Sequence, residues 1–242
     1  MAFTAMRSVA IIAWMTEHGG IQSISFSGHE SFPLRFAWLT KAVRGVAEDR
    51  TLFASDDAVV KLGVGKNMVR AMRHWATRAN VIEVVPGEAR GGRYRPTELG
   101  TMLFGQRGHD PYLEDPATIW LVHWQLCSRR NALSSGELPS PTTWYWLFNE
   151  LRETAFTTDA AVSELLLLAK RFGGKQPSKG TVERDVSCFV RSYTPAEPDK
   201  KLSREDTYDS PLTDLTLLTR EPETDRLSFE RGKRVSGGQA AL

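Results

Sequence analysis

The chain has 242 residues and a hydrophobic fraction of 41%, which are enough for one or two globular cores. Its net charge of only +2 does not by itself indicate a nucleic-acid partner. Its two distant cysteines, Cys127 and Cys188, exclude a disulfide framework and a zinc ribbon, and they favour the reducing cytoplasm. No apolar run reaches the roughly 18 residues that a membrane span needs, so no membrane partner is expected.

Residues 1–25 are predicted to form an N-terminal extension. The stretch that follows, FSGHESFPLRFAWLTKAV, has apolar residues at helical spacing and predicts a helix over 33–47. Ser27 or Ser31 is the expected N-cap, and Pro33 suits the first turn. A second helix is predicted over 57–62. It ends at GVG, because glycine permits the sharp turn that must connect two short helices.

A third helix is predicted over 66–79, with an inward apolar stripe that includes Met72 and Trp75. A β-branched run, a glycine-rich turn and a short return strand then predict a hairpin over 81–96. Thr97 is expected to cap another helix. The order of helix, helix, turn, helix, hairpin and helix is typical of a winged helix-turn-helix, which is therefore predicted for residues 26–107.

An all-helical domain is predicted for residues 108–194, and it follows a polar junction. Its four helices are expected over 117–130, 142–153, 157–173 and 177–193. Residues 195–242 are predicted to form a linker, a β-hairpin and a flexible tail. The expected fold class is mainly α with small β-hairpins.

The basic residues gather on the third helix and the hairpin. Between positions 61 and 95 there are eight basic and two acidic residues, a local charge of +6. In a winged helix-turn-helix the third helix enters the major groove and the wing contacts the DNA backbone. The predicted contacts are Lys66, Asn67, Arg70, Arg73, Arg78, Arg90, Arg93 and Arg95. The alternative is a solvated basic face on a domain that binds proteins.

Two polar stretches hold the candidate catalytic residues. SGHESF contains His29 and Glu30, and GHDPYLEDP contains Asp110, Glu114 and Asp115. Clustered carboxylates can hold a divalent cation such as Mg²⁺ for phosphodiester chemistry, although no particular metal ligand is assigned. The alternatives are a backbone-capping segment and an ordinary helix entry. No P-loop, GxSxG or HExxH occurs, so no nucleotide or organic cofactor is expected.

Four motifs occur together in a recognisable order. They are FSGHESFPLRFAWLTKAV, DDAVVKLGVGKNMVRAMRHW, YRPTELG and DPYLEDPATIWLVHW. In this order they resemble the SspB-type family of the Ssp DNA phosphorothioation defence system. The resemblance implies binding of double-stranded DNA and nicking of one strand to allow sulfur insertion. It also implies that the protein functions together with a cysteine desulfurase, an ATPase and an ATP-pyrophosphatase-like subunit.

The resemblance assigns no catalytic residue. The family pattern continues past RLSFERGKRV, so this chain is expected to be a shortened form. Two interpretations without catalysis stay open. One is a DNA-binding regulator or targeting subunit, and the other is a protein-interaction module within the modification machinery.

Overall fold

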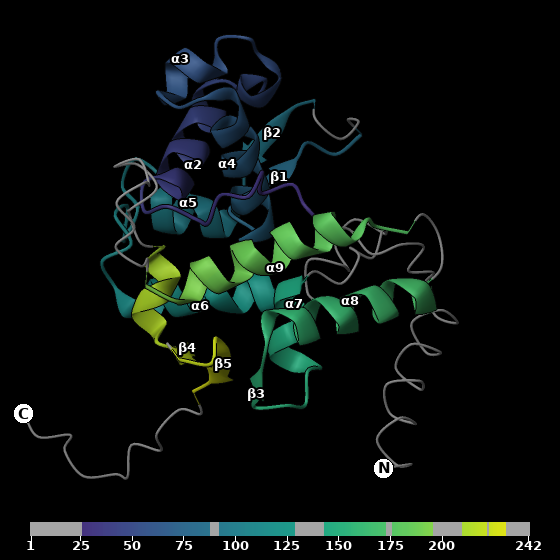
Figure 1. Cartoon of the computed structure of the whole chain (residues 1–242). Helices are drawn as coiled ribbons and strands as arrows, with labels where there is room; N and C mark the ends of the chain where they lie inside the picture. The colour runs from purple at the N-terminus through teal and green to yellow at the C-terminus, as the bar shows by residue number, and fades with distance from the viewer. Residues whose placement is uncertain are drawn as a thin grey trace, which may run out of the picture.

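The computed structural model describes residues 26–87, 92–128, 143–172, 176–195, 210–221 and 223–230. The predicted extension at 1–25 and tail at 231–242, and most of the predicted linker, fall outside these ranges. Helices dominate the described part, with two small antiparallel sheets beside them (Figure 1). The predicted mainly α class with small β-hairpins is confirmed. None of the described helices is long and apolar enough to cross a membrane.

The first part of the chain follows the predicted order of elements. Its helices are α2 (Trp38–Glu48), α3 (Ala58–Leu62), α4 (Lys66–Arg78) and α5 (Glu98–Phe104), with the 3-10 turn η1 (Leu52–Ala54) after α2. Strands β1 (Ile82–Val84) and β2 (Tyr94–Pro96) form an antiparallel hairpin between α4 and α5. The hydroxyl of Thr97 accepts a hydrogen bond from the Gly100 N–H, so the predicted cap of α5 is confirmed.

The loop before α2 differs from the prediction. The helix begins at Trp38 rather than near Pro33, and its first turn has no side-chain cap. Ser27, Glu30 and Ser31 have φ values of 87°, 49° and 65°, which a right-handed helix cannot contain. The prediction that Ser27 or Ser31 caps the helix is therefore wrong. Residues 27–31 instead form an irregular loop, whose distant contacts are described below.

The turn between α3 and α4 has the predicted chemistry. Gly63 ends α3 at φ 65°, the left-handed conformation in which glycine carries no Cβ penalty. On α4, the apolar stripe that includes Met72 and Trp75 is buried, as its spacing predicted. The indole N–H of Trp75 donates to the carbonyl of Phe32 at 2.9 Å. This bond ties α4 to the loop that precedes α2.

The second part of the chain contains helices and one sheet. The helices are α6 (Pro116–Cys127), α7 (Thr143–Asn149), α8 (Thr158–Phe172), α9 (Lys179–Tyr193) and the 3-10 helix η4 (Pro211–Leu215). Strands β4 (Leu218–Glu221) and β5 (Arg226–Phe229) form the predicted C-terminal hairpin. The short strand β3 (Ala155–Phe156) pairs with β5 on its other edge, giving the order β3-β5-β4. The expectation of an all-helical unit is therefore wrong, because β3 lies within it.

Helix α9 crosses the middle of the molecule in Figure 1, between the first part of the chain and helix α8. Its inner face is apolar and fully buried at Val186 and Phe189. Its Arg191 donates to the carbonyl of Ser31 at 2.5 Å, and Asp185 binds the same loop. The helix therefore anchors the loop 27–31 to the second part of the chain. The division near residue 107 stays a prediction.

Candidate nucleic-acid interface and adjoining pocket

The outer face of α4 carries most of the predicted DNA contacts. Lys66, Asn67 and Arg70 are exposed, and Arg73 and Arg78 are half-buried. The buried face of the same helix points into the core through Val69, Met72, Trp75 and Ala76. Since a helix turns about 100° per residue, this core stripe forces the basic positions onto the opposite side. The structure therefore brings together the five predicted contacts that lie on α4.

The hairpin adds exposed arginines, but part of its charge is neutralised. Arg95 forms an ion pair with Glu83, with its Nη2 and the carboxylate Oε1 2.7 Å apart, directly across the β1–β2 register. Lys61 pairs with Asp49 at 2.9 Å, and its hydrogen bond lowers the pKa of Asp49 to about 2. Arg93 is exposed, and Arg90 lies outside the described residues. The local count of +6 therefore overstates the charge available to a polyanion.

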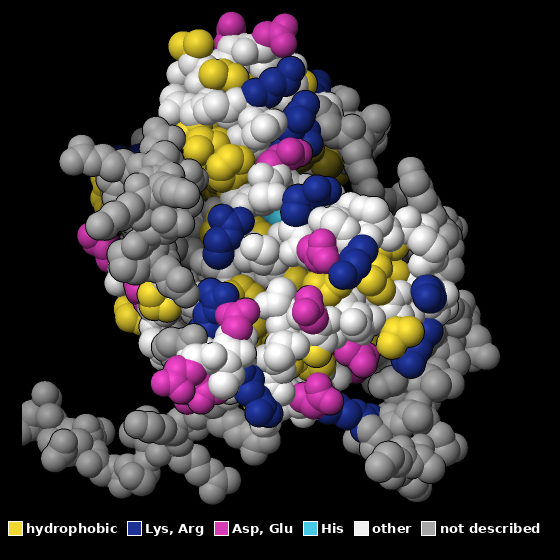
Figure 2. Space-filling view, in the orientation of Figure 1, with side chains coloured by type: hydrophobic (Ala, Val, Ile, Leu, Met, Phe, Trp, Pro, Cys, Tyr) yellow, Lys and Arg dark blue, Asp and Glu magenta, His cyan; other side chains and the backbone are white. Residues whose placement is uncertain are grey.

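Figure 2 shows one face of the molecule, in the orientation of Figure 1. Lys and Arg side chains run from the top of the molecule to its middle, with acidic side chains among them. In the centre, a hollow between basic side chains exposes a small area of histidine. This face therefore carries charges of both signs. An anion-binding site on it would depend on how a few neighbouring side chains are arranged, rather than on the overall charge of the face.

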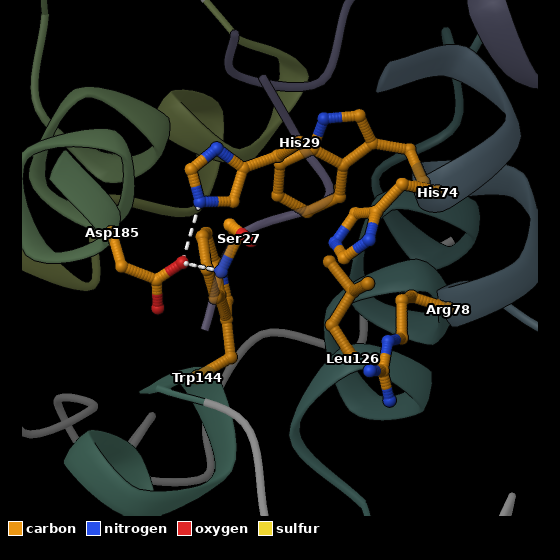
Figure 3. A pocket seen from close by; sticks show the side chains of 8 residues that line it. Ser27, His29, His74, Arg78, Leu126, Trp144 and Asp185 are labelled. Carbon is orange, nitrogen blue, oxygen red and sulfur yellow. Dashed lines mark hydrogen bonds and ion pairs between the residues drawn. The ribbon is translucent and has the colours of Figure 1, made fainter. Parts of the chain in front are cut away.

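A small pocket lies where the loop 27–31 meets four helices (Figure 3). It is lined by Ser27, His29, His74, Trp75, Arg78, Leu126, Trp144 and Asp185. These residues come from the loop and from α4, α6, α7 and α9. The cavity volume is about 20 Å³, enough for one water molecule or one oxygen of a larger group. Residues far apart in sequence therefore build one polar recess.

Asp185 organises one wall of this pocket. Its carboxylate is buried and accepts hydrogen bonds from the backbone N–H of Ser27 at 2.9 Å and from Nε2 of His29 at 2.6 Å. The Thr143 hydroxyl donates to the second carboxylate oxygen. Since a buried carboxylate is costly unless hydrogen-bonded, these three donors explain how α9 can carry an acid on its inner face.

His29 has both ring nitrogens engaged. Nδ1 accepts a hydrogen bond from the backbone N–H of Ser31 at 2.9 Å, so the ring proton lies on Nε2 and is donated to Asp185. This tautomer leaves no lone pair to abstract a proton from a substrate. The neighbouring candidate, Glu30, is exposed. Catalysis by either residue stays a prediction, and the observed role of His29 is to hold the loop.

His74 faces His29 from α4, with the ring centroids 5.9 Å apart. Burial lowers the pKa of His74 well below its usual value, and the charges of Arg78 and Arg73 and the ring of His29 add to the effect. A Cβ on Gly28, whose φ is +102°, would lie 2.5 Å from Nδ1 of His74. The loop therefore needs glycine at this position to close over the imidazole.

The predicted carboxylate cluster forms the entry to α6. The two oxygens of Asp110 accept hydrogen bonds from the backbone N–H groups of Glu114 at 2.9 Å and Asp115 at 3.1 Å. Burial alone would raise the pKa of Asp110, but these bonds outweigh it and lower the pKa. Asp115 caps α6 through the Ala117 N–H at 2.8 Å.

These carboxylates do not form a ready magnesium site. Asp110 and Asp115 direct oxygens at backbone N–H groups, and Glu114 is exposed. Across the described ranges, no three His, Cys, Asp or Glu side chains gather closely enough to hold a metal ion. Metal binding by Asp110, Glu114 and Asp115 therefore stays a prediction.

Sequence reasoning missed His74 and Asp185. A signal for His74 was present, because it lies four residues from both Arg70 and Arg78 and so shares their side of α4. Asp185 interrupts the apolar stripe formed by Val182, Val186 and Phe189, which marks it as an acid that needs buried donors. Its partners Ser27 and His29 lie more than 150 residues away in the sequence, where no local pattern indicates them.

Comparisons with known proteins agree on one family. The model of a family described as "Protein of unknown function (DUF4007)" matches residues 26–240. A magnesium ion-bound SspB crystal structure is similar to 88% of this chain, with 32% identity and a TM-score of 0.75. A second SspB crystal structure is similar to 89% of it, with 31% identity and the same TM-score. The chain spans 61% and 63% of those two chains. No curated protein matches it.

Proposed function

The chain belongs to the DUF4007 family and has the fold of SspB, and we propose that it is a DNA-binding component of a phosphorothioation-based anti-phage defence system. The similarity to SspB supports the assignment to this system. The DNA-binding role rests on one observation: the side of α4 opposite its buried stripe carries exposed Lys66, Asn67 and Arg70. Double-stranded DNA in the cytoplasm is the proposed target.

In this proposal residues 26–107 act as a winged helix-turn-helix. Helix α4 enters the major groove, and the β1–β2 hairpin lies against the backbone as the wing. Asn67 and Arg70 lie near the start of α4, where side chains commonly reach base edges. Exposed Arg93 on the hairpin supplies a phosphate contact. The proposed division of labour places base reading on the helix and backbone contact on the wing.

Nicking of one DNA strand is the finer part of the proposal. It is supported by the resemblance to the SspB-type family and by the magnesium ion in one of the similar SspB structures. We assign no step to a metal ion, because the candidate carboxylates do not form a metal site in the described part of the chain. The proposed partners are the cysteine desulfurase, the ATPase and the ATP-pyrophosphatase-like subunit of the system.

A salt titration of duplex binding tests the DNA-binding role. Each phosphate contact contributes about 0.9 to the slope of log affinity against log salt. The double variant Arg70→Ala/Arg73→Ala should therefore bind more weakly and lose about 1.8 from that slope if both side chains contact phosphate. Lys170→Ala/Arg171→Ala removes the same charge from exposed positions on α8 and serves as the matched control. Equal affinity and slope in the folded α4 variant would remove this helix from the interface.

A plasmid assay tests nicking. Supercoiled plasmid with Mg²⁺ should yield open-circular product, and a chelator should stop it. DNA binding without open-circular product would favour the regulator or targeting subunit. Absence of both binding and product would favour the protein-interaction module.

A further inference from the structure

One polar stripe runs along α4 from its exposed start to the pocket. Asn67, Arg70, His74 and Arg78 are spaced by three, four and four residues, which places them on one side of the helix. The guanidinium of Arg70 lies 3.5 Å from the side-chain oxygen of Asn67, as this spacing requires. The stripe is about 16 Å long at 1.5 Å per residue. Its two ends can therefore contact different groups of one extended polyanion.

The last two members of the stripe line the pocket. His74 and Arg78 both come from α4 and line the pocket, across from Asp185 and His29. In Figure 3 the imidazole of His74 faces the centre of the pocket, and the guanidinium of Arg78 lies lower, beside Leu126. An arginine fork and an imidazole on one wall are a donor set suited to an oxyanion. The acid on the far wall already accepts hydrogen bonds from Ser27, His29 and Thr143, so donors surround its charge.

We propose that this pocket binds one oxygen of a phosphate group between Arg78 and His74, and that in a DNA complex this phosphate belongs to the backbone of the duplex held by α4. The volume of about 20 Å³ admits a single oxygen, so the rest of the phosphate stays at the mouth. Ser27 lines the same pocket and is exposed to solvent. That the phosphate belongs to a DNA duplex rests on the proposed function. That the pocket binds an oxyanion does not depend on it.

The charges around His74 make it a reporter of occupancy. The charges of Arg78 and Arg73 on its own helix and of His29 on the loop act on its ring, and Asp185 lies on the far wall of the same pocket. Burial and the two arginines keep the imidazole neutral. A phosphate oxygen would offset the arginine charges and favour the protonated ring. Occupancy should therefore raise the pKa of His74 toward its ordinary value.

NMR of the histidine ring protons tests the pocket directly. Inorganic phosphate is titrated into the whole chain in phosphate-free buffer, with chloride at equal ionic strength as the control. The His74 resonance should move in a saturable way with phosphate, its pKa should rise, and both changes should vanish in Arg78→Ala. A short duplex is titrated in a second arm. Absence of a saturable His74 shift with either probe would overturn the proposal.

Duplex affinity distinguishes the two sources of phosphate. Arg78→Ala and His74→Gln should each weaken duplex binding by about tenfold, the loss expected for one charge-assisted hydrogen bond. Arg78→Ala should also lower the salt slope by about 0.9. Arg78→Lys keeps the charge and loses the fork, and Arg171→Ala is the distant control. Thermal midpoints close to that of the parent chain show that each variant folds.

The outcomes separate this inference from the proposed function. If the parent chain binds no duplex, the proposed function is overturned. The NMR titration with inorganic phosphate then still tests whether the pocket binds an oxyanion. If all pocket variants bind the duplex as tightly as the parent chain and phosphate does not shift the His74 resonance, only the proposed phosphate site is overturned. A phosphate shift with unchanged duplex affinity would support the oxyanion site and overturn its backbone source.

Discussion

Removal of the Asp185 carboxylate should destabilise the protein strongly. Asp185→Ala leaves the N–H of Ser27, Nε2–H of His29 and the hydroxyl of Thr143 without their buried acceptor. Each donor left without a partner costs about 1–3 kcal/mol, so the loss of all three bonds costs at least about 3–4 kcal/mol. For a chain of this size, about 4 kcal/mol corresponds to a fall of roughly 10 °C in the melting temperature.

The conservative variant sharpens this test. In Asp185→Asn the amide oxygen can still accept from Ser27 and His29, while the amide NH₂ faces the Thr143 hydroxyl, which can turn to accept. The expected cost is therefore about 1 kcal/mol. Chemical unfolding monitored by circular dichroism measures both values, with the exposed Asp214→Ala as control. If Asp185→Ala cost no more than Asp214→Ala, the hydrogen-bond network would not anchor the loop and this role of α9 would be refuted.

Three further predictions concern other positions. Gly28→Ala should lower the free energy of unfolding by about 2 kcal/mol, because its Cβ would lie 2.5 Å from His74 at a φ of +102°; an unchanged unfolding midpoint would contradict this. Burial lowers the pKa of His123 to about 4, so the unfolded chain takes up the proton first and stability should fall as pH drops from about 6.5 to 4, by up to about 3 kcal/mol. His123→Gln should flatten that pH dependence of the unfolding midpoint. Burial raises the pKa of the Cys127 and Cys188 thiols, so iodoacetamide should label neither in the native protein and both in denaturant, as read by mass spectrometry.

Helix α4 shows how much of the fold the sequence can predict. Its start after a glycine turn and its buried stripe both follow from local residue types and a period of 3.6. The β1–β2 hairpin and the Thr97 cap follow from equally local rules. In each case the residues that decide the structure lie within a few positions of one another, so a single sequence contains the necessary information.

The loop 27–31 shows why the rest could not be predicted. Serine, proline and apolar spacing favour a capped helix there, yet the segment has positive φ angles. Its conformation depends on Asp185 and Arg191 of α9, which bind the backbone at Ser27 and Ser31. Strand β3 was missed for a related reason, since two residues become a strand only when β5 pairs with them. Long-range partners override local preference at these sites.

The two histidines of the pocket show what structure adds to residue type. His29 stands in a motif that suggests chemistry, yet Ser31 and Asp185 occupy both of its nitrogens. His74 stands in no such motif, yet it faces the recess beside Arg78. A histidine becomes reactive or ligand-binding through the partners of its nitrogens rather than through its neighbours in sequence. Of the two histidines, His29 is fixed by its hydrogen bonds and holds the loop over α4. His74 is the histidine whose protonation can respond to a bound anion.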